Sequence, residues 1–89
     1  MTAAPASRST EAVTTAIVRF LNTEIMAPGH PVAADDVLAD AGVDSMALLK
    51  VLVFLERELG VWIPDEDLND EVVRSARTLA AYVRSRSPE

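Results

Sequence analysis

The segment from Asp44 to Gly60 constrains the fold more than any other part of this sequence. It contains no proline or glycine between its two ends. Asp is a favoured helix N-cap because its carboxylate accepts amide hydrogens of the first turn, and Gly adopts the left-handed conformation that often ends a helix. Four leucines recur at helical intervals on one face: Leu48, Leu52, Leu55 and Leu59. The sequence therefore predicts a helix over Ser45–Leu59 that buries this stripe.

Three further helices are expected to pack around this one. The first covers about 10–26, where apolar residues recur at intervals of three and four. A short third helix is expected to begin at Asp70 and Glu71, and a fourth is expected to begin near Thr78, which can cap it. We therefore predict an all-α fold, a four-helix bundle with a short third helix and a long loop between the first and second helices.

That first loop is long for so small a chain. Loops of this length are usually functional or poorly ordered, and Val37 and Leu38 are its expected anchors in the core. The 89 residues leave room for one domain. We place this domain at 9–86, between flexible tails at 1–8 and 87–89.

A second stripe on the central helix predicts a contact surface. This stripe consists of Met46, Lys50, Val53 and Arg57. It lies about 150° around the helix from the leucines and mixes apolar with basic side chains. A helix in a small domain seldom buries every face, so part of this stripe should be exposed. Trp62 follows in an extended segment and could be a partner anchor. We expect a partner-binding surface formed by Met46, Leu49, Lys50, Val53, Arg57 and Trp62. The alternative is that the first and fourth helices cover the stripe.

Composition argues against several functional classes. There are 14 acidic and 8 basic residues, and the net charge of −6 disfavours contact with nucleic-acid phosphates. With no cysteine, and with His30 as the single histidine, neither a thiolate metal site nor a catalytic triad can be built. The acidic run at 65–71 lacks the ligand spacing of an EF-hand loop. We therefore expect no enzyme, no nucleic-acid partner and no metal site.

The same features bear on location. The longest apolar run, 51–55, is too short to cross a membrane, and the first ten residues lack the apolar core of a signal peptide. The absence of cysteine fits a reducing compartment. We expect a cytoplasmic monomer that has no membrane partner.

The stretch Gly42-Val43-Asp44-Ser45-Met46 resembles the Gly-x-Asp-Ser-Leu/Met motif of the acyl carrier and peptidyl carrier protein family. Alone, an Asp-Ser pair at a helix start would be an ordinary cap. Further similarity covers most of the chain: Leu55–Val61, the Ile63-Pro64 pair, the Asp-Glu-Asp-Leu run that follows, and the Thr-Leu and Tyr-Val pairs of the last helix. Together these segments are typical of free-standing carrier proteins.

The resemblance implies a covalent cofactor. A phosphopantetheinyl transferase would attach 4′-phosphopantetheine from coenzyme A to Ser45, beside Asp44. The thiol of this arm would then carry an acyl or aminoacyl group as a thioester. The implied partners are therefore the transferase, a loading ligase or adenylation enzyme, and a downstream transferase, oxidase or synthase.

Departures from the usual family pattern indicate which kind of carrier this sequence resembles. Fatty-acid carriers usually present an acidic second helix, whereas this one carries Lys50 and Arg57. The sequence is more similar to carriers of natural-product pathways, of the polyketide or nonribosomal peptide type. The alternative function is an unmodified helical adaptor that binds a protein through Met46, Val53 and Trp62.

Overall fold

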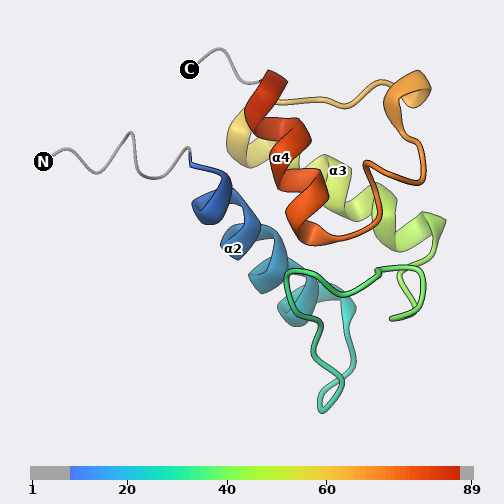
Figure 1. Cartoon of the computed structure of the whole chain (residues 1–89). Coiled ribbons are helices and arrows are strands. Elements are labelled where there is room, and N and C mark those ends of the chain that lie inside the picture. The colour runs from blue at the N-terminus through green and yellow to red at the C-terminus, as the bar shows by residue number, and fades with distance from the viewer. Residues whose placement is uncertain (1–8, 87–89) are drawn as a thin grey trace, which may run out of the picture.

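The computed structural model describes residues 9–86 and shows an all-α domain. In these residues, three α-helices are joined by one long and one shorter connection (Figure 1). The elements are α2 (Thr10–Phe20), the π-helical turn η1 (Leu21–Ile25), α3 (Ser45–Leu59), the 3₁₀ turn η2 (Asp65–Asp67) and α4 (Ala76–Arg86). The all-α fold and the long first loop are confirmed. The predicted tails at 1–8 and 87–89 lie outside the described residues.

The first two helices form as the sequence predicts. Ser9 caps α2 and accepts the Ala12 amide hydrogen at 3.0 Å between N and Oγ. Helical structure then continues through η1 to Ile25, close to the expected end. The other helix, α3, has Asp44 as its N-cap and Gly60 as its C-cap in the left-handed conformation, with φ of 71°. A side chain at Gly60 would be strained there, which explains why the helix ends on glycine.

The expected short third helix is reduced to a single turn, and this part of the prediction is wrong. The Asn69 side chain accepts the Val72 amide hydrogen at 2.9 Å, and its carbonyl accepts that of Val73 at 3.1 Å. Ser75, two residues later, already caps α4. The segment therefore has room for one turn only, and so short a helix gains too few backbone hydrogen bonds to propagate.

The cap of α4 also differs from the prediction. Ser75, not Thr78, occupies the N-cap, because the Thr78 amide donates to Ser75 Oγ at 3.2 Å. A second hydrogen bond runs the other way, because the Oγ1 atom of Thr78 accepts the Ser75 amide hydrogen at 2.9 Å. This mutual arrangement is a capping box, and it satisfies two orphan donors at once.

The core lies between the three helices and the two connections. α2 packs closely along α4, and α3 passes behind α4 in the view of Figure 1. On α3, Leu52 and Leu55 are buried as predicted, while Leu48 and Leu59 are only half-buried. Val51 is fully buried and was missed by the leucine stripe. The other buried apolar side chains are Val13, Ile17, Leu21, Val32, Leu38, Val61, Ile63, Ala76, Leu79, Ala80 and Val83.

The long loop is tied to the helices at several points, which explains how it holds a defined path. The Asn22 side chain donates to the Val32 carbonyl at 3.0 Å and accepts the Val32 amide hydrogen at 2.8 Å. The Leu38 amide donates to the Arg74 carbonyl at 2.8 Å. Leu38 is buried, whereas Val37 is half-buried, so Leu38 is the stronger of the two predicted anchors.

One arginine adds a further tie between the loop and the helices. The Arg77 guanidinium contacts Asp35 in the loop and Glu11 on α2, at 2.7 Å each. These carboxylates raise the pKa of Arg77, chiefly through the hydrogen bond that its guanidinium donates to Asp35 and then through the one that it donates to Glu11. The loop therefore reaches α3 from a fixed direction, which positions the residues just before Ser45.

Candidate functional site

Ser45 is the first residue of α3 and its side chain is exposed. The preceding residue, Asp44, is extended and holds the helix start, because its Oδ1 accepts the Ala47 amide hydrogen at 2.9 Å. The Asp44 carbonyl also accepts the Leu48 amide hydrogen at 2.8 Å. The Ser45 hydroxyl itself makes no hydrogen bond within residues 9–86. A hydroxyl in this position is accessible to an enzyme that modifies it.

Gly42 shapes the approach to Ser45. Its φ is +98°, a backbone conformation that side chains rarely adopt. A Cβ at this position would meet no atom within 4 Å, so the requirement for glycine is conformational and not steric. Nearby, the Val43 amide donates to the carbonyl of buried Leu38 at 3.0 Å. The glycine therefore lets the loop turn from this core anchor into the cap of α3.

A small cavity opens directly beside Ser45. It holds about 290 Å³ and is bordered by the end of the loop, the start of α3 and the single turn before α4. Its lining is mostly apolar: Leu38, Ala39, Val43, Asp44, Ser45, Leu48 and Val73. The half-buried position of Leu48 follows from this cavity, because the residue borders open space on the side of Ser45.

The first turn of α3 suits a phosphate. The amide hydrogens of Ser45 and Met46 make no hydrogen bond among the described residues, whereas Asp44 already occupies that of Ala47. Free amides at a helix N-terminus, together with the helix dipole, favour an anion at this place. A phosphodiester on Ser45 Oγ would lie beside them. The residues present therefore fit a phosphate-linked group.

Comparison with known protein families gives a match over residues 11–83, from the first turn of α2 into α4. The matching family is described as a phosphopantetheine attachment site. The chain belongs to this family. It is therefore a carrier domain that is not itself catalytic, and its cofactor is covalent 4′-phosphopantetheine. No curated protein matches the sequence.

The predicted partner-binding residues of the carrier domain are exposed. Met46 is 69% exposed, Leu49 49%, Val53 41% and Trp62 51%. Trp62 points away from its buried neighbours Val61 and Ile63, as the sequence predicts. The first and fourth helices therefore do not cover the apolar members of this stripe, and a role in partner binding stays a prediction.

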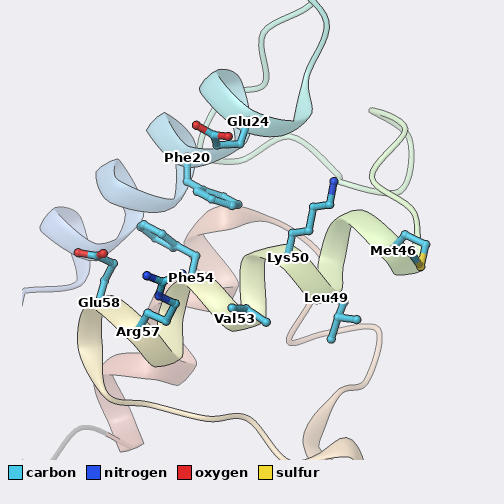
Figure 2. Close-up of a pocket in the computed structure, with 9 residues that line it drawn as sticks. All are labelled: Phe20, Glu24, Met46, Leu49, Lys50, Val53, Phe54, Arg57 and Glu58. Atoms are coloured by element: carbon cyan, nitrogen blue, oxygen red, sulfur yellow. The ribbon is translucent and has the colours of Figure 1, made fainter.

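The structure brings five of these residues together and leaves one apart. Met46, Leu49, Lys50, Val53 and Arg57 line one groove between α2 and α3, which holds about 680 Å³. Trp62 is not part of this lining. The side chains of the groove are drawn in Figure 2.

Sequence reasoning missed the wall that α2 contributes to this groove. Phe20 and Phe54 stack with ring centroids 4.5 Å apart and an interplanar angle of 21°, and Figure 2 shows them between the two helices. Glu24 and Glu58 complete the lining. The periodicity of each helix places Phe20 and Phe54 near the edge of a face, but periodicity within one helix cannot show which partner they meet.

Among the described residues, no helix is long and apolar enough to cross a membrane. The longest α-helix is α3, with 15 residues. A membrane span requires about 20 predominantly apolar residues.

Proposed function

We propose that the carrier domain holds its arm on Ser45 and tethers an acyl or aminoacyl group as a thioester. The observation that carries this proposal is the exposed, unbonded Ser45 hydroxyl at the N-terminus of α3, beside two unpaired amide hydrogens. When attached, the arm supplies the thiol that the cysteine-free chain lacks.

Asp44 has two roles in this proposal. Its Oδ1 accepts the Ala47 amide hydrogen and so fixes the direction in which α3 presents Ser45. Its carboxylate is also exposed, so a phosphopantetheinyl transferase can contact it directly. An Asp at this place therefore marks the serine for the transferase as well as capping the helix.

The cavity beside Ser45 supports a further part of the proposal. Its size of about 290 Å³ and its apolar lining suit the first part of an arm or a small apolar cargo. The buried leucines Leu52 and Leu55 belong to the packed core, so a longer chain would have to displace core side chains. We therefore propose a small cargo.

One exposed face of α3 supports the choice of pathway. Lys50 and Arg57 are exposed on the face that also exposes Met46 and Val53, so partners meet a face of mixed basic and apolar side chains, not an acidic one. We propose a cytoplasmic, monomeric carrier in a natural-product pathway of the polyketide or nonribosomal peptide type. Its partners are the phosphopantetheinyl transferase, a loading ligase or adenylation enzyme, and a downstream transferase, oxidase or synthase.

Intact-mass measurement tests the attachment directly. The protein is incubated with coenzyme A and a broad-specificity phosphopantetheinyl transferase, and it should gain the mass of one phosphopantetheine. Ser45→Ala should gain nothing. Ser85→Ala is the matched control, because Ser85 is an exposed serine in α4, far from any helix start; this variant should be modified like the wild type. A gain that persists in Ser45→Ala refutes the assignment of Ser45.

The exposure of Met46, Val53 and Trp62 favours a second candidate, a helical adaptor that works without the arm. The two candidates differ in their dependence on Ser45. An adaptor would bind its partner equally well as wild type or Ser45→Ala, and with or without coenzyme A treatment. A carrier would deliver cargo to its partner only after modification.

A further inference from the structure

The groove between α2 and α3 has an apolar ridge along one side. Met46, Leu49 and Val53 follow one another at intervals of three and four on α3, and all three are exposed. Their spacing places them on one side of the helix, and Figure 2 draws all three along α3. This spacing is that of a helix seam that packs against a second helix, as in a coiled coil. Within residues 9–86, no second helix covers this seam.

A row of basic residues runs beside the ridge. Lys50 and Arg57 are seven residues apart, so they lie on the same line of α3, about 10 Å from one another along its axis. Neither takes part in an ion pair of the described residues. In packed helix pairs, residues that flank the seam form ion pairs with the facing helix. Both basic groups are therefore available to carboxylates of an incoming helix.

The floor and far wall of the groove limit the occupant further. The stacked rings of Phe20 and Phe54 give the floor an apolar surface that belongs to both helices. Glu24 and Glu58 also line the groove, so its four charged groups cancel, while the whole chain carries −6. Acidic residues of a docked segment are therefore favoured only in the row that faces Lys50 and Arg57, and not over the whole surface of that segment.

We propose that the groove docks an amphipathic α-helix of a partner protein, with apolar side chains on its seam and two carboxylates seven residues apart. The apolar residues pack on Met46, Leu49 and Val53, and the carboxylates pair with Lys50 and Arg57. This inference rests on the proposed carrier function, because it names the kind of enzyme surface that visits the modified serine. Met46 directly follows Ser45, so a helix docked here lies beside the arm.

Two synthetic peptides test the chemistry of the occupant. Each carries leucines at seam positions over two heptads; the first has Glu at two flanking positions seven residues apart, and the second has Lys there. Both are titrated into the isotope-labelled, phosphopantetheinylated protein while backbone amide resonances are followed. The Glu peptide should shift resonances of α3 from Met46 to Arg57 and of Phe20 and Glu24. It should bind about tenfold more tightly than the Lys peptide, as expected for two exposed ion pairs.

Charge reversal supplies the decisive comparison. In Lys50→Glu with Arg57→Glu, the preference should invert in favour of the Lys peptide. The matched control is Arg19→Glu with Arg74→Glu, which makes the same change in net charge at two exposed arginines outside the groove; it should keep the preference for the Glu peptide. Equal binding of the two peptides, binding of neither, or shifts that map away from the groove would overturn the inference.

The same preparations separate this inference from the proposed function. Intact mass reports whether the wild-type protein accepts the arm, and the titration can be repeated on unmodified protein. A protein that is modified at Ser45 but does not distinguish the peptides overturns the docking inference alone. A protein that distinguishes them but accepts no arm contradicts the proposed function and leaves the groove assignment standing.

Discussion

Asp44 should serve both the stability of α3 and the recognition of Ser45, and two substitutions separate these roles. Asp44→Ala removes the oxygen that accepts the Ala47 amide hydrogen at 2.9 Å. Asp44→Asn keeps an acceptor oxygen at the same place but removes the charge. Asn and Asp are about equally good N-caps, whereas Ala is poor. The structure therefore predicts that the two variants differ in stability.

The expected magnitudes follow from one exposed capping bond and the helix dipole. Loss of an N-cap to alanine costs about 1 kcal/mol of unfolding free energy. Loss of the charge alone costs roughly 0.3 to 1 kcal/mol near a helix N-terminus, and screening by salt reduces this cost. For a domain of this size, 1 kcal/mol lowers the melting temperature by about 4 to 8 °C. Asp44→Asn should lose clearly less than Asp44→Ala, above all at high ionic strength.

The rate of phosphopantetheine transfer to Ser45 should fall in both variants. If the transferase contacts the exposed carboxylate of Asp44, either substitution removes a charged hydrogen-bond partner, and the rate should fall about tenfold or more. Thermal unfolding followed by circular dichroism gives the stabilities, and a time course of intact mass gives the rates. Equal destabilisation by Asn and Ala would refute the capping argument. Modification of Asp44→Asn at the wild-type rate would refute the recognition argument.

Three further predictions concern contacts and backbone geometry outside α3. Asn22→Ala should lower the unfolding free energy by roughly 1 to 3 kcal/mol in urea unfolding, because both backbone groups of buried Val32 lose their partner; an unchanged midpoint would contradict it. Gly42→Ala should cost about 1 to 2 kcal/mol in the same assay, since φ is +98° there. The Tyr82 hydroxyl donates to Asp67, and this bond, followed by burial, raises the pKa of Tyr82. This bond therefore stabilises the fold fully below about pH 10, and its contribution is lost as the pH rises through the higher folded-state pKa of Tyr82. In Tyr82→Phe the free energy of unfolding should fall less over this alkaline range than in the wild type. An identical decline in the two proteins would refute the assignment.

The central helix could be predicted from the sequence because its signals are local. Asp44 and Gly60 act within one turn of the chain, so both ends of α3 agree with the prediction. Trp62 was also predictable, because alternation in an extended segment fixes its direction relative to Val61 and Ile63. Ser45 stood out for its place at a cap and for its flanking residues.

The remaining features depend on contacts between distant segments. The single turn before α4 ends early because Ser75 is taken by a capping box with Thr78, and either residue alone is a plausible cap. The groove depends on the stacking of Phe20 on Phe54 across two helices, which the spacing within one helix does not specify. The two hydrogen bonds between the Asn22 side chain and the Val32 backbone likewise join residues ten positions apart, which no local sequence pattern links.

The most direct test of the account is to locate the modification on the chain. After treatment with coenzyme A and a phosphopantetheinyl transferase, the protein is digested and the peptide that contains Ser45 is fragmented in a mass spectrometer. The account predicts one phosphopantetheine, attached to Ser45 alone. A protein that stays unmodified under conditions in which a known carrier is fully converted, or one that carries the group on another residue, would contradict it.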